Sequence, residues 1–368
     1  HQPAMFKNDG PSKTLDDLIV PVIICALTVI QVHLFLTGYR LTADDVLFHK
    51  VMMQGWEASW NFIRETAIGQ GRIVHFVDLP FTLIGSYFAE NMYFRTFYTG
   101  LYFLNFFLAG MYVEKLLKKK IKYLVILILL SFHPLDYFHL APNAYPFRIS
   151  LPLFLILISR IHLLDIRSRD RADDTLKNVF YLFVCFSGMA FSEYGFLACL
   201  ALMLTEASIT GSVFGTHRSV PAKIKTIITN KYIRHDGYLI LLFLVIYMGF
   251  GLIYPSSYPG NKLSGDVRIF PIVKTLIGHI YGGTSVSSFF RYPKEISGFF
   301  PTLGYKEIVS VVLIFSGTCF LGIRILKQII TEKKSPVLKK AALPIICYGL
   351  FFSFVVTLPV AMTEKYQT

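Results

Sequence analysis

Long apolar runs recur along nearly the whole chain, and short basic stretches separate them. A helix that crosses the roughly 30 Å hydrocarbon core of a membrane needs about 20 apolar residues. Shorter crossings are tolerable inside a larger bundle. The pattern predicts an all-α fold, a polytopic transmembrane helical bundle of about nine spans. The predicted spans are residues 17–38, 94–113, 123–133, 147–160, 178–191, 194–208, 237–254, 307–325 and 341–361.

The composition favours a membrane protein and excludes several other classes. Hydrophobic residues make up 54% of the 368 residues and charged residues 16%, whereas about a quarter of the residues in soluble domains are charged. This excludes a soluble enzyme with a solvated shell, a disordered chain and a secreted disulfide scaffold. The five cysteines lie inside apolar segments without a CxxC pair. They are predicted to be small buried apolar residues, not metal ligands or disulfides.

The basic residues predict the orientation of the chain. Of the 36 Lys and Arg residues, 23 fall in the N-terminal segment and in four stretches on one side of the predicted bundle. Cytoplasmic loops carry an excess of Lys and Arg, so this side is predicted to be cytoplasmic and to include the N-terminus. The net charge of +13 then indicates orientation and solvated basic faces, not a nucleic-acid partner. The four stretches are Lys115–Lys122, Arg160–Lys177, Arg218–Arg234 and Arg324–Lys340.

The same orientation places three sizeable loops, 39–93, 133–146 and 255–306, on the outer side of the membrane. A tenth apolar stretch, 73–90, contains a charged residue and a proline, and counting it as a span would put a basic cluster outside. It is therefore predicted to be an interfacial or re-entrant helix. The chain reads as a single integral-membrane domain, 1–368. Its end directly after a predicted span fits a protein truncated at the C-terminus.

Two adjacent carboxylates, Asp44 and Asp45, follow the first predicted span at the outer membrane boundary. Neighbouring helical residues diverge by about 100°, so one carboxylate could face a cavity while the other caps a helix predicted at 46–66. The functional interpretation is a general base or a ligand for a divalent cation such as Mg²⁺ or Mn²⁺. The alternative is that both residues only cap that helix.

A second motif, Gly69-Gln70-Gly71-Arg72, ends the same predicted helix. Its glycines allow a turn, and Arg72 would then point at the membrane interface. Arginine binds phosphate through two parallel hydrogen bonds, which makes Arg72 a candidate for a lipid phosphate. The alternative is an arginine that snorkels to lipid headgroups.

Other candidate residues lie near the predicted outer ends of later spans. A carboxylate amid so much apolar sequence, Glu193, is a candidate functional residue, although it could also cap a helix. The arginines Arg148 and Arg291 could bind an anionic headgroup, or could anchor a helix and meet ordinary anionic lipids. Three residues of an aromatic loop are possible sugar contacts, or else ordinary polar loop residues. They are His133, Asp136 and His139.

The order of these features resembles the GT-C class of integral-membrane glycosyltransferases. A first span, an outer acidic pair at Asp44 and Asp45, an interfacial helix and the pair Gly71-Arg72 follow one another. The chain looks most like the bacterial serotype-converting glucosyltransferases that modify O-antigen. The likeness in architecture extends along the chain, but the motifs are confined to about residues 40–75.

The resemblance implies an all-helical enzyme of the bacterial inner membrane with a periplasmic active site. It implies an inverting transfer of a hexose, glucose in the group it resembles, from polyprenyl phosphate to a lipid-linked O-antigen or another surface polysaccharide. Asp44 or Asp45 would be the catalytic base, and Arg72, Arg148 and Arg291 would bind the donor phosphate. No cofactor is expected, and the divalent cation considered above stays an open alternative. The expected sugar contacts are Gln70, His133, Asp136, His139 and Glu193.

Two alternatives remain open at this point. An O-antigen or capsule polysaccharide polymerase is also a multispanning protein, and it would depend on outer arginines more than on the acidic pair. A flippase or transporter for lipid-linked glycans would need a polar path, and the predicted spans carry few charges. The sequence contains no GxxxxGK[ST], GxGxxG, HExxH or GxSxG motif, which argues against an ATP-driven pump, a zinc protease and a serine hydrolase.

Overall fold

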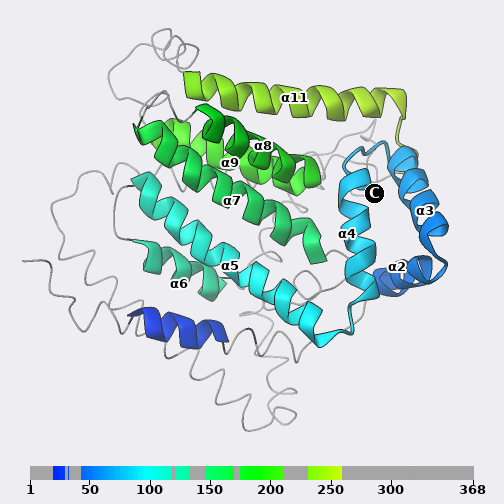
Figure 1. Ribbon diagram of the computed structural model, residues 1–368, viewed down its shortest axis with the longest axis horizontal. Coiled ribbons are helices and arrows are strands. Elements are labelled where there is room, and N and C mark those ends of the chain that lie inside the picture. The colour runs from blue at the N-terminus through cyan, green and yellow to red at the C-terminus, as the bar shows by residue number, and fades with distance from the viewer. Residues whose placement is uncertain are drawn as a thin grey trace, which may run out of the picture.

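The computed structural model describes residues 20–29, 32, 43–117, 121–132, 146–169, 175–209, 231–258 and 316. The regular elements in these residues are α-helices, so the predicted all-α class is confirmed there (Figure 1). An apolar helix at Val20–Val29 comes first. The others are α2 (Ala43–Met53), α3 (Trp56–Gln70), α4 (His75–Tyr87), α5 (Met92–Leu117), α6 (Lys122–Phe132), α7 (Pro146–Arg169), α8 (Thr175–Phe191), α9 (Glu193–Ile209) and α11 (Lys231–Ile253).

Helices occupy the first seven predicted spans at least in part. The last two, 307–325 and 341–361, lie outside the described residues except for residue 316. Among the described helices, one segment, Tyr232–Ile253 of α11, is both long and apolar enough to cross a membrane. The finding is therefore an all-α protein with one candidate span, and the nine-span bundle stays a prediction.

The helices from α5 onward alternate in direction. In the parallel pair α5 and α7, the Asn105 side-chain amide donates to the Ser150 carbonyl, at 2.9 Å, and Lys115 pairs with Asp165 further along. Contacts between α7, α8, α9 and α11 show that α8 and α11 run the opposite way to α7 and α9. The segments next to three predicted cytoplasmic stretches consequently lie at one end of the bundle. The turn after α3 and the start of α9 lie at the other end (Figure 1).

The outer loop predicted at 39–93 contains three helices and the beginning of α5. One helix was predicted at 46–66, and this is wrong: Gly55, with φ 98°, divides the segment into α2 and α3. Few residues other than glycine adopt this φ. The next helix, α4, has 13 residues and is about 20 Å long, which is too short to cross a hydrocarbon core of about 30 Å.

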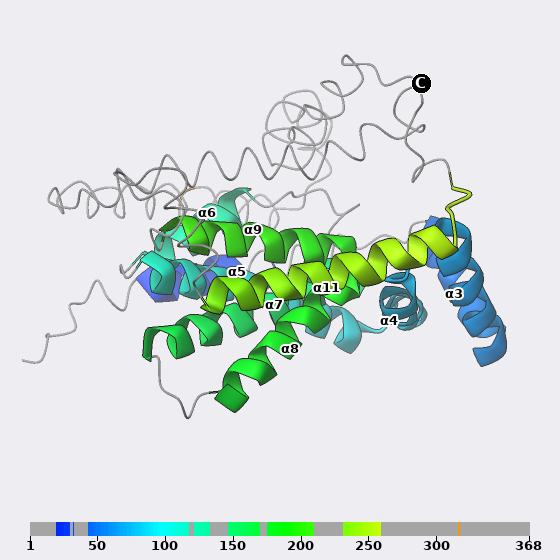
Figure 2. The same ribbon diagram turned by 90° about the horizontal axis from the view of Figure 1, so that it is seen from above.

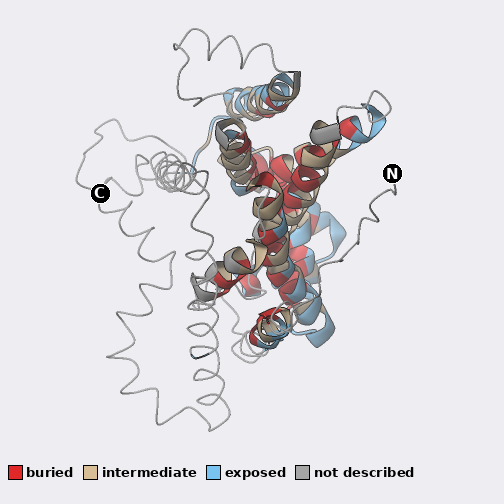
Figure 3. Ribbon diagram, turned by 90° about the vertical axis from the view of Figure 1, so that its left-hand side faces the viewer, coloured by how far each residue is buried: buried red, intermediate tan, exposed pale blue. Residues whose placement is uncertain are grey.

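The apolar core lies where α5, α7, α8 and α9 meet, and Figure 3 shows buried residues concentrated along this line. In contrast, α11 packs on α8 and α9 from outside (Figure 2). Only 11% of its apolar window is buried. Large apolar side chains of α11 such as Val245 and Leu252 are exposed. A wide exposed apolar face of this kind is typical of contact with lipid or with another protein surface.

Four charged residues, three of them buried and Arg167 partly buried, connect these helices at the end opposite the α3–α4 turn. Arg160 of α7 is completely buried and donates to Glu206 of α9, at 2.8 Å, and to Asp236 of α11, at 2.8 and 3.0 Å. Arg167 donates to the same two carboxylates, at 2.7 to 3.1 Å. Tyr112 of α5 donates to Glu206, at 3.0 Å. We call Arg160, Arg167, Glu206 and Asp236 the charge quartet.

The prediction that the stretch beginning at Arg160 is solvated is wrong for Arg160 itself. Its guanidinium is fully buried. Two carboxylates, from helices much later in the chain, compensate its charge and accept its hydrogen bonds. Sequence spacing did not reveal this, since Glu206 and Asp236 follow Arg160 by 46 and 76 residues.

Arg160→Met removes one cation of the charge quartet and keeps a long side chain. Two buried carboxylates would then share a single guanidinium, so the free energy of unfolding should fall by about 3–5 kcal/mol. Chemical unfolding of the detergent-solubilised protein, followed by circular dichroism, measures this change. Arg64→Met alters an exposed arginine of α3 and is the matched control. Equal stability of the two variants would contradict the assigned role of Arg160.

Candidate functional site

The α3–α4 turn builds the centre of the candidate site. Gly71 ends α3 with φ 62°, and the backbone N–H of Arg72 donates to the Ala67 carbonyl, at 2.9 Å. A Cβ on Gly71 would lie 2.6 Å from the Tyr254 carbonyl oxygen. The predicted glycine turn is thus confirmed at Gly71, where both the backbone conformation and the contact with the end of α11 require glycine.

The turn directs Arg72 toward Glu193, the first residue of α9. Arg72 Nε donates to Glu193 Oε1, at 2.6 Å, and the Tyr247 hydroxyl of α11 donates to the same oxygen, at 3.0 Å. The side chains of Arg72 and Glu193 keep 22% and 19% of their exposure. Two predicted site residues that are 121 positions apart therefore meet at one place.

Burial and charge act in opposite directions on Arg72. Loss of solvent lowers the pKa of its guanidinium, whereas the Glu193 carboxylate raises it through charge and a hydrogen bond, and the pKa stays above its ordinary value. Arg72 is therefore a permanent cation at the end of an apolar helical bundle. Such a group can bind an anion, provided that the anion shares Arg72 with Glu193 or displaces this carboxylate.

A buried histidine follows the turn. His75 Nδ1 lies 3.0 Å from Asp78 Oδ1, and His75 Nε2 lies 3.0 Å from Gln70 Oε1. Both partner atoms are oxygens that accept hydrogen bonds, so the two ring nitrogens of His75 face acceptors from α4 and α3. Gln70 was predicted as a sugar contact, and here it links His75 to the surface of α3.

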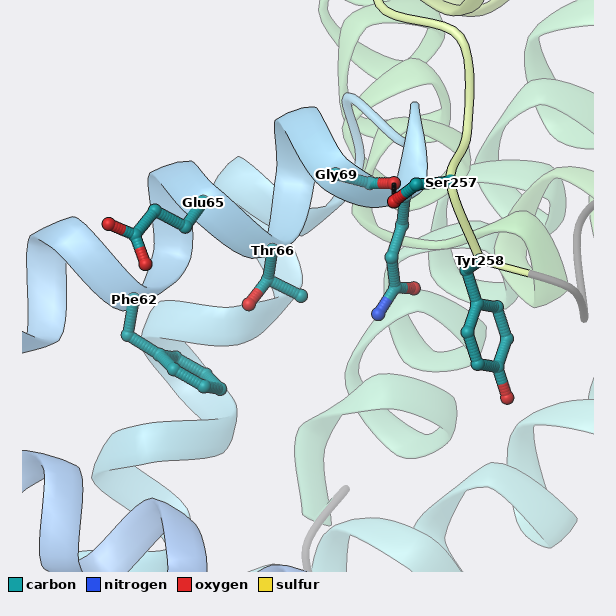
Figure 4. Close-up of a pocket in the computed structure, with 7 residues that line it drawn as sticks. Phe62, Glu65, Thr66, Gly69, Ser257 and Tyr258 are labelled. Carbon is teal, nitrogen blue, oxygen red and sulfur yellow. Dashed lines mark hydrogen bonds between the residues drawn. The ribbon is translucent and has the colours of Figure 1, made fainter.

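An open groove lies beside Gln70, between α3 and the residues that follow α11. Its volume is about 460 Å³. Ser257 joins the two walls, because its backbone N–H and its hydroxyl both donate to the Gly69 carbonyl, at 2.8 Å each. Figure 4 shows the groove with the rings of Phe62 and Tyr258 on the same side of α3. We call it the α3 groove, and its lining is Phe62, Glu65, Thr66, Gly69, Gln70, Ser257 and Tyr258.

The acidic pair lies in the first turn of α2, inside the helix rather than at its cap. Asp44 is exposed and Asp45 is 1% exposed, which agrees with the predicted divergence of neighbouring helical residues. One turn later, His49 stacks on Tyr87 at the C-terminal end of α4, with ring centroids 5.7 Å apart. Arg72 precedes the other end of α4 (Figure 1). The structure therefore does not bring the acidic pair and Arg72 into one site.

The structure does not describe the side chains of the remaining predicted site residues. Arg148 lies in the first turn of α7, and its side chain is outside the described set. His133, Asp136, His139 and Arg291 lie outside the described residues, as does most of the predicted loop 255–306. Within the described segments, no group of three or more His, Cys, Asp or Glu side chains could hold a metal ion.

Sequence reasoning missed three residues of this region. Asp78 was noted only as a charge within 73–90, although His75 and Asp78 have the i, i+3 spacing of helical neighbours. Tyr247 gave no signal among the many aromatic residues of α11, because its role depends on the packing of α11 beside α9. His75 and Tyr247 therefore join Arg72 and Glu193 as candidate site residues.

Comparison of the chain with known protein families, with curated proteins and with solved structures finds no match. The functional argument consequently depends on the residues themselves.

Gly71→Ala should disrupt the turn that places Arg72. A methyl group there meets the Tyr254 carbonyl and requires an unfavourable φ, so the free energy of unfolding should fall by about 1–3 kcal/mol. Thermal unfolding measures the loss, and mass spectrometry after phenylglyoxal treatment should show faster modification of Arg72. Gly100→Ala is the control, because a Cβ there meets nothing within 4 Å. Unchanged stability and reactivity in Gly71→Ala would refute the assigned role of the turn.

Proposed function

We propose that the protein is an integral-membrane glycosyltransferase that takes a hexose from polyprenyl phosphate. The observation that carries the proposal is the cationic Arg72, held by Glu193 and Tyr247 at one end of an apolar helical bundle, beside an open groove. A lipid-phosphate donor needs apolar surface for its tail and a cation for its phosphate. The exposed apolar face of α11 and Arg72 at its C-terminal end meet these two demands.

The proposed reaction is a direct displacement with inversion at the anomeric carbon. The acceptor hydroxyl gives its proton to a carboxylate while its oxygen attacks, and the lipid phosphate leaves with the bonding electron pair. Phosphate is a weakly basic leaving group, so acid catalysis is of little use. The acceptor belongs to a lipid-linked O-antigen or another surface polysaccharide, and the site faces the periplasm in this proposal.

Asp44 is the proposed base because its carboxylate is exposed, whereas Asp45 is buried. The 13 residues of α4 separate Asp44 from Arg72, so these two residues do not act together at one reacting centre. Base and phosphate ligand must lie within a few ångströms of one substrate. Two arrangements satisfy the chemistry: Asp44 acts with another phosphate ligand such as Arg148, or Arg72 acts with Glu193 as its base.

A flippase or transporter for lipid-linked glycans is the second candidate. In its favour, the charge quartet places more charge inside the helical bundle than the sequence indicated. Its cations and carboxylates already compensate one another, which favours a structural role over a transport path. A polymerase would depend on arginines, and Arg72 fits that requirement as well.

The base is tested by assaying hexose transfer from polyprenyl-phosphate glucose with Asp44→Asn, Asp45→Asn and Glu193→Gln. Loss of the general base should lower kcat by about 10²–10⁴-fold. The decrease should follow Asp44 in the first arrangement and Glu193 in the second. Glu57→Gln changes an exposed carboxylate of α3 and should leave the rate unchanged. Full rates in all three variants and in Asp44→Asn/Asp45→Asn would refute carboxylate catalysis.

The phosphate role of Arg72 predicts a particular change in the kinetics. Arg72→Ala should raise KM for the lipid donor about tenfold or more, and Arg72→Lys should recover only part of the loss, because lysine lacks the planar two-donor geometry. Arg64→Ala, in an exposed position on the preceding helix, controls for the change in charge. A KM for donor that stays at the wild-type value in Arg72→Ala would rule out donor-phosphate binding by this residue.

A further inference from the structure

The two faces of α3 have different roles. Ser59, Ile63 and Ala67 follow one another at four-residue spacing and are buried, and Ile63 packs among residues of α2 and α4. Phe62 and Thr66 have the same spacing one position earlier and line the α3 groove. A helix repeats every 3.6 residues, so the groove residues form a continuous stripe beside the buried one. The stripe continues through Gly69 to Gln70, next to the Arg72 turn.

The opposite wall of the groove comes from the segment that follows α11. Ser257 holds this segment to α3 through its two hydrogen bonds to the Gly69 carbonyl, and Gly71 allows its backbone to approach closely. Tyr258 lines the groove and is 40% exposed. In Figure 4 the rings of Phe62 and Tyr258 project to the same side, with Thr66 between them.

The chemistry of the lining is that of a carbohydrate site. Aromatic faces pack against the C–H groups of a pyranose, while carboxylate, amide and hydroxyl side chains bond its hydroxyl groups. Two rings, two aliphatic hydroxyls, one amide and one carboxylate line the groove. The volume of about 460 Å³ lies within the roughly 300–1,000 Å³ range of small-molecule pockets.

Charge narrows the ligand class further. Glu65 is the only charged side chain among the lining residues, so the α3 groove repels anions and favours a neutral sugar. The cation for a phosphate, Arg72, lies two residues beyond Gln70 and points instead toward Glu193. Sugar and phosphate would therefore bind on different sides of the same turn.

We propose that the α3 groove binds a neutral pyranose of the glycan acceptor, with Phe62 and Tyr258 as stacking faces and Glu65 as a hydrogen-bond acceptor. The groove assigns substrate-binding roles to residues of α3 and of the 254–258 segment. The identification of this sugar as the acceptor rests on the proposed function, whereas the binding of a neutral sugar does not.

The test measures sugar binding without catalysis. The full chain in lipid nanodiscs is titrated with methyl glucoside and cellobiose, and binding is followed by saturation-transfer NMR. Loss of one hydrogen bond to a charged group or of one stacking face should weaken binding about tenfold. Glu65→Gln and Tyr258→Ala, both at exposed positions, should each show this loss. Glu57→Gln, two turns earlier on α3, should bind as the wild type does.

The outcomes separate this inference from the proposed function. No binding of either neutral sugar to the wild type would overturn the inference, and so would binding that Glu65→Gln and Tyr258→Ala leave unchanged. Equal or tighter binding of glucose 6-phosphate or glucuronate would overturn the assignment to neutral sugars. If the sugars bind as expected but no hexose is transferred from polyprenyl-phosphate glucose, the assignment of the α3 groove as a sugar site stands and the proposed transferase function is refuted.

Discussion

The charge quartet is the interaction on which the arrangement of the described bundle depends. A buried guanidinium is unfavourable unless carboxylates surround it with good geometry, and Arg160 has two of them, from α9 and from α11. Each of these helices therefore has little freedom to slide along α7 without breaking an ion pair. Tyr112 extends the same restraint to α5. The quartet therefore contributes to the register of all four helices.

The same alignment of the helices also positions the residues at their opposite ends, next to Arg72. Glu193 begins α9 and Tyr247 lies near the end of α11, so their meeting with Arg72 requires that both helices be correctly aligned. For α11 the requirement is strong, because only 11% of its apolar window is buried and few buried side chains locate it. Asp236 near its beginning and Tyr247 near its end supply polar contacts at both ends.

The sequence predicted those parts of the structure that depend on a single local pattern of residues. Apolar runs gave helices in the described segments, and the pair Gly71-Arg72 gave a tight turn because only glycine suits that backbone. Asp44 and Asp45 diverged in exposure as a helix requires. The break at Gly55 was missed because a single glycine within a helical pattern is often tolerated.

Contacts between residues that are far apart in the chain could not be predicted from the sequence. Arg160 is the last residue of the predicted span 147–160 and precedes more basic residues, so it was assigned to a solvated stretch. Its burial depends on Glu206 and Asp236, which reach it only through helix packing. The same holds for Arg72 with Glu193: each residue was a candidate by itself, but their pairing needs the alternation of all the helices between them. The separation of Asp44 from Arg72 likewise follows from the length and direction of α4.

The hairpin of α8 and α9 has a consequence for Glu193. The two helices approach so closely at Gly188 and Gly195 that a Cβ on Gly195 would collide with the Gly188 carbonyl, and Glu193 stands at the tip between them. Its backbone position is therefore set by rigid main-chain contact before any ligand arrives. The pair with Arg72 is preorganised in this way: if a substrate phosphate took the place of Glu193 at Arg72, side chains would have to move, but the helices that carry them would need little reorganisation.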